Sequence, residues 1–185
     1  MPFHQDKTSS RAVAASAVAV VVCCMVANTA AFGAGSGYGV SPPPSAAVGG
    51  FHKVVSSKTI PISGGSVKGS SFGTSATVII PDGSLKHPSQ VVLTGGSPNL
   101  IRAGHGRRVV AGMSVVLLNP NNGKKLFGPF SPALKVTLRD PSIVKGDYVV
   151  EVISVGKSFK VPSTVTKGQA IVFFKIDANF AVVHG

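Results

Sequence analysis

The sequence predicts an all-β domain, an antiparallel β-sandwich, and three observations support this fold class. Apolar residues beyond residue 50 come in short runs rich in β-branched side chains. Clusters of Gly, Pro, Asn and Asp separate these runs at the spacing of turns. The same part of the chain has no long stretch with the 3.6-residue spacing of an amphipathic helix. The uneven strands and long connections favour a sandwich, with a barrel as the alternative.

The first element, residues 1–31, has the pattern of a signal peptide. A polar start containing Lys7 and Arg11 precedes an uncharged run at residues 12–27, and small residues follow. The run is shorter than the roughly 20 residues of a spanning helix, although an uncleaved anchor is the alternative. Cys23 and Cys24 fall inside it, so the exported chain has no thiol. We therefore expect a secreted or cell-surface protein of bacterial type, where folding does not rely on disulfides.

Residues 32–50 form a predicted linker rich in Gly, Pro and Ser, because such a composition buries too little apolar surface to offset the entropy of ordering it. Residues 51–185 form the predicted domain. Its expected strands, in chain order, are Thr74–Ile80, Gln90–Thr94, Arg107–Leu118, Leu134–Arg139, Asp147–Val155 and Gln169–Ile176. The runs from Val109 and from Val149 are the most continuously apolar and predict central strands.

Two local patterns add detail. In the run from Leu134 the polar side chains alternate with apolar ones, so Lys135 and Arg139 are expected on one solvated face. The pair Asn122-Gly123 tolerates positive φ and predicts a hairpin between residues 113–118 and residues 125–127.

Residues 62–67, residues 76–85 and residues 91–94 together resemble the opening of the β-sandwich domain shared by netrin receptors, zona occludens proteins and ankyrins, and that of its bacterial surface relatives. The shared features are a Gly-Gly turn, a strand, a corner of the form Ile-Pro-x-Gly-small-Leu, and a further strand. The resemblance implies an Ig-like fold. It implies no self-cleavage, because nothing in the chain matches the His-Phe-Ser type of site.

The closing segments of the chain, from Phe159 to His184, are similar to the last strands of cupredoxins. The copper site of that family needs a Cys thiolate beside two His, and the exported chain has no Cys. This similarity therefore implies sandwich geometry only, and we expect neither a metal site nor a cofactor.

Enzymatic chemistry is not expected. Only five carboxylates follow residue 31, namely Asp82, Asp140, Asp147, Glu151 and Asp177. The four Asp residues stand in turns, where this side chain bonds nearby backbone. No nucleophile elbow and no phosphate-binding loop is present.

Charge is the remaining signal. Without Lys7, Arg11 and Asp6 the exported chain has 16 basic and 5 acidic side chains, a net charge of +11. Such a field attracts anionic polymers. The densest local charge is a glycine-containing loop, and its candidate anion-binding residues are Arg102, His105, Arg107 and Arg108.

From these features we expect a non-enzymatic protein of the cell envelope or extracellular matrix that associates with an anionic cell-wall polymer or polysaccharide. A carbohydrate-binding module and a self-assembling surface or fibre subunit are the alternatives. No membrane span is expected after cleavage. Sequence-specific nucleic-acid binding is not expected, because no recognition helix is predicted. The oligomeric state is left open.

Overall fold

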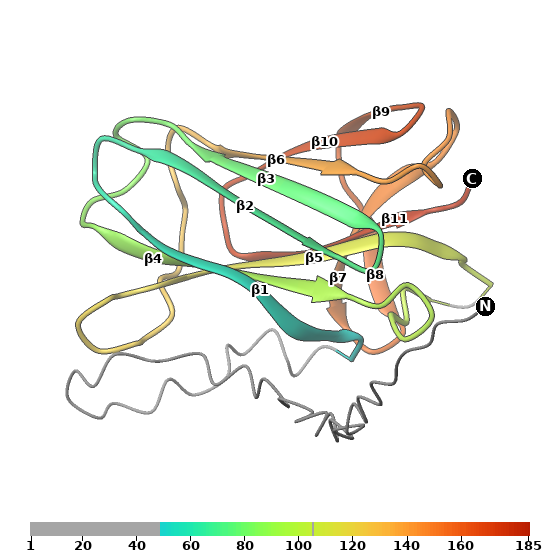
Figure 1. Ribbon diagram of the computed structural model, residues 1–185, viewed down its shortest axis with the longest axis horizontal. Helices are drawn as coiled ribbons and strands as arrows, with labels where there is room; N and C mark the ends of the chain where they lie inside the picture. The colour runs from blue at the N-terminus through green and yellow to red at the C-terminus, as the bar shows by residue number, and fades with distance from the viewer. Residues whose placement is uncertain (1–48, 105) are drawn as a thin grey trace, which may run out of the picture. The chain divides into compact units, whose positions relative to one another are not determined.

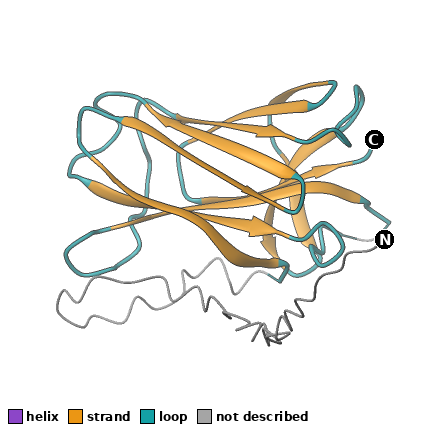
Figure 2. Cartoon of the chain, in the orientation of Figure 1, coloured by secondary structure: helices purple, strands orange, loops and turns teal. Residues whose placement is uncertain are grey.

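The computed structural model describes residues 49–104 and 106–185, and these residues form eleven β-strands and no helix (Figure 2). The predicted all-β class is confirmed. The predicted signal peptide, most of the predicted linker and His105 lie outside the described residues.

The strands form two antiparallel sheets (Figure 1). In spatial order, the six-stranded sheet consists of β1 (Phe51–Ile60), β4 (Ser89–Gly96), β5 (Val109–Leu118), β11 (Ala178–Val183), β7 (Tyr148–Ser154) and β8 (Lys157–Lys160). The five-stranded sheet consists of β2 (Gly65–Ser71), β3 (Thr74–Ile80), β6 (Leu134–Arg139), β10 (Gln169–Phe174) and β9 (Ser163–Thr166).

The core lies between the two sheets, because alternate residues of each strand face inward. The six-stranded sheet contributes Leu93 and Val115, for example, and the five-stranded sheet contributes Val78, Val136 and Val172. All of these side chains are buried. Two separate sheets around one apolar core give a β-sandwich-like arrangement.

Six strands appear where the sequence predicts them, and two of these, β3 and β6, have the predicted ends. On β6, Lys135 and Arg139 share the outward face, as predicted from the alternation. β5 is central, and β7 lies between β11 and β8, although its end at Ile153 is exposed. The predicted hairpin also forms: Leu118 bridges to Lys125, and Gly123 has a φ of +66°.

The register places different connections at the two ends of the sandwich (Figure 1). Ser75 of β3 pairs with Arg139 of β6, so the β2–β3 turn and the β6–β7 connection lie at one end, together with the start of β5. Gln90 of β4 pairs with Leu118 of β5, so the β3–β4 and β5–β6 connections lie at the other end. Each end has a hollow of its own.

Candidate anion-binding cleft

A cleft of about 790 Å³ lies beside the β4–β5 loop. Its walls come from three connections that are far apart in sequence: the β2–β3 turn, the β4–β5 loop and the β6–β7 connection. The arginines Arg102, Arg107 and Arg108 all line it, and Phe72 and Asp140 approach from the other two connections. The structure therefore brings together three of the four predicted anion-binding residues, while His105 lies outside the described residues.

The β4–β5 loop is shaped by apolar side chains that it packs onto the outer face of the six-stranded sheet. Ile101 and Ala103 are 4% and 1% exposed, and they join a cluster with Phe51, Val150 and Val183. Burial of these side chains stabilises the folded loop.

Glycine at position 112 makes room for this packing. A Cβ at Gly112 would lie 2.2 Å from Cδ1 of Ile101, so the sheet accepts the loop because β5 has no side chain there. A Cβ at Gly96 of β4 would also lie close to the same methyl group, at 2.6 Å. The path of the β4–β5 loop therefore depends on two glycines on neighbouring strands.

Arg107 is held by side-chain hydrogen bonds. Its Nη1 donates to the hydroxyl of Ser158 at 2.7 Å and to the carbonyl of Ala103 at 3.2 Å. The Ser158 hydroxyl donates to the same carbonyl at 2.5 Å. The guanidinium therefore sits at a fixed place between the loop and strand β8, and its other N–H groups have no partner among the described residues.

Arg102 and Arg108 are fixed through their backbones only. The carbonyl of Arg102 accepts from the amide of Gly156 at 2.9 Å, and the carbonyl of Arg108 accepts from the amide of His184 at 2.9 Å. Both side chains are exposed. Within residues 49–104 and 106–185 none of the three arginines forms an ion pair, so their charges remain available to a ligand.

Asp140 is the one carboxylate in the cleft wall, and it is committed to the fold. It is 5% exposed, its Oδ2 accepts from the hydroxyl of Thr74 at 2.7 Å, and its Oδ1 accepts from the amide of Ser142 at 2.9 Å. The bond to Ser142 is the local turn contact expected for this Asp. Its charge opposes anion binding, and the three arginines outnumber it.

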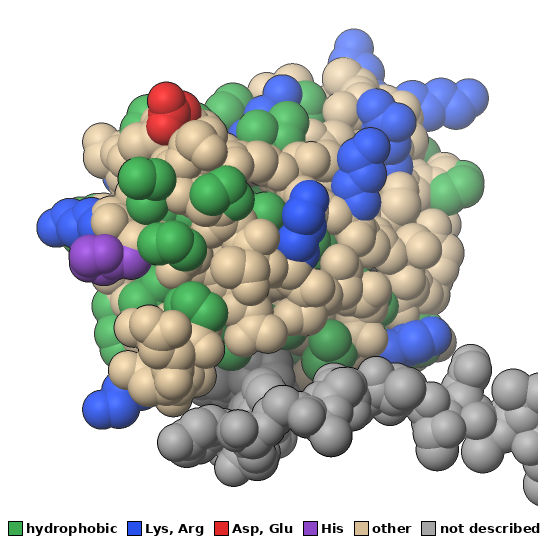
Figure 3. All heavy atoms as spheres, turned by 60° about the vertical axis from the view of Figure 1, so that its left-hand side comes forward, with side chains coloured by type: hydrophobic (Ala, Val, Ile, Leu, Met, Phe, Trp, Pro, Cys, Tyr) green, Lys and Arg blue, Asp and Glu red, His purple; other side chains and the backbone are tan. Residues whose placement is uncertain are grey.

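Basic charge continues next to the cleft. A smaller hollow of about 470 Å³ shares Arg107 and is lined also by Lys157 and Ser158 of β8. On β8, Nζ of Lys160 lies 4.9 Å from the centre of the Tyr148 ring. Figure 3 turns the other end of the sandwich toward the viewer, and there too Lys and Arg side chains are spread over the surface while acidic groups are sparse.

Two other carboxylates lie outside the cleft lining. Asp147 accepts a hydrogen bond from the amide of Val144 at 2.9 Å, and its Oδ1 lies 2.9 Å from Nδ1 of His184. Burial raises the pKa of Glu151, and the charge of Lys125 opposes this shift.

Burial also raises the pKa of Asp177 to about 7, although Lys125 at 3.6 Å and the amide of Leu117 at 3.2 Å favour its charged form. This carboxylate bonds a distant strand rather than its own turn, in contrast to the prediction for turn Asp residues. In the described part of the chain, no group of three or more His, Cys, Asp or Glu residues is placed to hold a metal ion.

Sequence reasoning found the three arginines because they lie close together in the chain. It missed Ser158, which positions Arg107, and the place of Asp140 in the cleft wall. The Asp140-Pro141-Ser142 turn was visible in the sequence, but its proximity to the loop depends on sheet register.

No family model and no curated protein matches the sequence. Among the described residues, the chain has no helix of the length and apolarity that crossing a membrane requires.

Proposed function

We propose that this chain is an exported, non-enzymatic protein of the cell envelope or extracellular matrix, and that its Ig-like domain binds anionic polymer through basic surface groups. The observation that carries the proposal is the cleft lined by Arg102, Arg107 and Arg108, none of which forms an ion pair among the described residues. Guanidinium groups form paired, charge-assisted hydrogen bonds to phosphate, sulfate and carboxylate.

The cleft is suited to a polymer because it is open and flanked by further basic groups. Arg107 lines both the main cleft and the hollow that reaches Lys157, so successive anionic groups along a chain find cations on both sides of it. The net charge of +11 in the predicted exported chain adds a long-range attraction. Ser158 supports affinity by fixing one guanidinium before binding.

The proposal is tested with the domain on columns carrying teichoic acid or heparin, over a series of salt concentrations. We expect retention at about 150 mM salt and a steep fall at higher salt, because each neutralised anionic group releases counterion. A neutral polysaccharide column serves as the control. Salt-insensitive retention on the neutral polysaccharide would favour the carbohydrate-binding alternative. Concentration-dependent sedimentation without polymer would favour self-assembly.

A further inference from the structure

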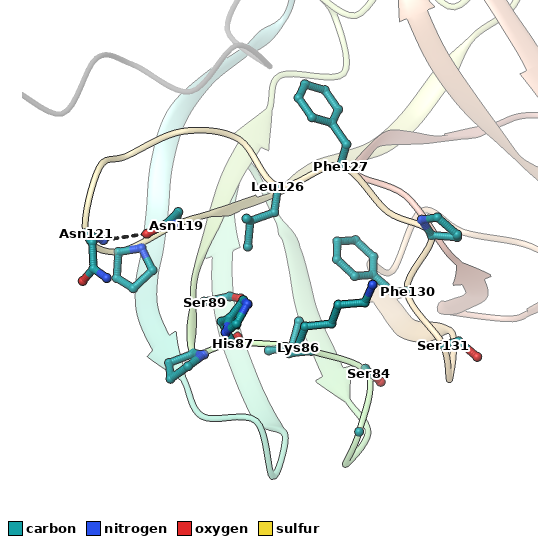
Figure 4. Close-up of a pocket in the computed structure, with 15 residues that line it drawn as sticks. Ser84, Lys86, His87, Ser89, Asn119, Asn121, Leu126, Phe127, Phe130 and Ser131 are labelled. Atoms are coloured by element: carbon teal, nitrogen blue, oxygen red, sulfur yellow. Dashed lines mark hydrogen bonds between the residues drawn. The ribbon is translucent and has the colours of Figure 1, made fainter.

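A second pocket lies at the opposite end of the sandwich from the cleft lined by Arg102, Arg107 and Arg108, which we call the arginine cleft. It has a volume of about 600 Å³, within the range of small-molecule sites. The β3–β4 connection forms one wall, at residues 83–89. The β5–β6 connection forms the others, at residues 119–121 and residues 126–131 (Figure 4).

The inner surface of this pocket is apolar. Leu85 and Phe130 are 5% and 6% exposed and belong to the core between the sheets, and the partly buried Leu126 packs against that core. Proline side chains widen this surface, while the ring of Phe127 is 83% exposed and points away from Phe130 in Figure 4. An apolar or aromatic group can therefore leave water here against a wall that is already packed.

The two loops are held in place without a ligand. The hydroxyl of Ser84 donates to the carbonyl of Pro132 at 2.9 Å, which joins one loop to the other. The amide of Phe130 donates to the carbonyl of Lys175 at 2.6 Å, and the amide of Leu126 donates to the carbonyl of Leu117 at 2.8 Å. A ligand therefore meets a pocket whose walls are already formed, which lowers the entropic cost of binding.

The pocket lining contains one ammonium group and no carboxylate. Lys86 and His87 line it, and neither Asp nor Glu does. Figure 4 shows the Lys86 side chain extending toward Phe130, with Leu126 facing them from the β5–β6 connection. Among the described residues Lys86 forms no ion pair.

We propose that this pocket binds a small aromatic carboxylate, with the ring against Leu126 and Phe130 and the carboxylate at the ammonium group of Lys86. The apolar wall favours an aromatic ring, and the ammonium group of Lys86 beside it favours a carboxylate. This site is separate from the arginine cleft, because the two hollows share no lining residue.

The test uses naphthylacetate, its neutral analogue naphthylethanol, and acetate, each titrated into the isotopically labelled protein and followed by amide chemical shifts. We expect naphthylacetate to shift the amide signals of residues 83–89 and residues 119–131. We expect it to bind about tenfold more tightly than naphthylethanol, because only the carboxylate accepts a charge-assisted hydrogen bond from Lys86. Acetate alone should leave these residues unshifted.

The variant Lys86→Met should remove the preference for naphthylacetate over naphthylethanol while leaving naphthylethanol binding unchanged. Lys167→Met, an exposed lysine outside the pocket lining, should preserve the preference. A variant with Arg102, Arg107 and Arg108 all changed to Ala should also preserve it. Equal affinity of the parent protein for the two naphthyl compounds, or shifts confined to the arginine cleft, would overturn the proposal.

Discussion

Arg107 and Ser158 are joined by a 2.7 Å hydrogen bond from Nη1 to the hydroxyl oxygen, across 51 positions of sequence. The bond connects the β4–β5 loop to the edge strand β8, and the carbonyl of Ala103 accepts from both side chains. It turns an otherwise flexible arginine into a positioned one. The proposed anion site therefore depends on a serine that itself carries no charge.

Replacing Ser158 with Ala should weaken anionic-polymer binding about two- to threefold, because Arg107 must then be ordered when the polymer binds. The free energy of unfolding should fall by about 1 kcal/mol through the lost hydrogen bond. Heparin retention and thermal melting measure the two effects. The control is Ser163→Ala on β9, an exposed serine outside the cleft. Unchanged affinity in Ser158→Ala would mean that the serine does not position the arginine.

The contact of Ile101 with Gly112 predicts a coupled pair of substitutions. Gly112→Ala should destabilise the domain by about 1 to 2 kcal/mol because the new methyl overlaps Cδ1 of Ile101. Ile101→Ala should cost about 2 to 4 kcal/mol by leaving a cavity. In the double variant the new methyl occupies part of that cavity, so the loss should be smaller than the two single losses combined. Chemical denaturation of the four proteins provides the comparison, and simple additivity would contradict the packing account.

Asp140→Asn should increase anionic-polymer affinity, because it removes the one negative charge from the cleft wall. The domain should become less stable by about 1 kcal/mol, since the charged acceptor of the Thr74 hydroxyl is lost. The amide oxygen still accepts from Ser142. Retention on heparin and a melting curve report the two changes. Weaker retention by a folded variant would show that Asp140 does not oppose the anion.

Asp177 predicts a pH dependence of stability. Its folded pKa of about 7 lies above the 3.8 of an unperturbed Asp, so between these pH values the folded state holds a proton that the unfolded state has lost. The stabilisation from this group is complete below about pH 4 and disappears as the pH rises through 7, a change of about 2 to 4 kcal/mol. Asp177→Asn should flatten this part of the stability profile.

Denaturant unfolding at several pH values measures the effect. Asp82→Asn, at an exposed turn, is the matched control and should retain the slope of the parent protein. An unchanged slope in Asp177→Asn would exclude this carboxyl as its source.

The sequence was informative where local chemistry decides the structure. The alternation around Lys135 and the turn at Gly123 predicted β6 and its neighbouring hairpin, because each depends on residues close in the chain. The long edge strand β1 was missed. It mixes Lys, Ser and His with apolar residues, and its pairing with β4 contains two register shifts, so it has no simple period of two.

The candidate site residues were likewise predictable only where they lie close together in the sequence. Arg102 and Arg107 are near neighbours in sequence, and their charge is visible without a fold. Ser158 joins them only through the packing of the β4–β5 loop over the outer face of the sheet. The second pocket was not predicted, because Lys86 and Phe130 stand on connections whose proximity depends on how the sheets pair and pack.

The central claim, that the arginine cleft binds anionic polymer, is tested most directly by two triple variants of equal charge. One changes Arg102, Arg107 and Arg108 to Ala. The other changes three exposed lysines outside the cleft lining to Ala: Lys68, Lys124 and Lys167. Binding to teichoic acid is measured over a salt series for both and for the parent protein. The account predicts that the arginine variant loses about two units of the slope of log K against log salt, while the lysine variant stays near the parent value. Equal slopes in the two variants would contradict it.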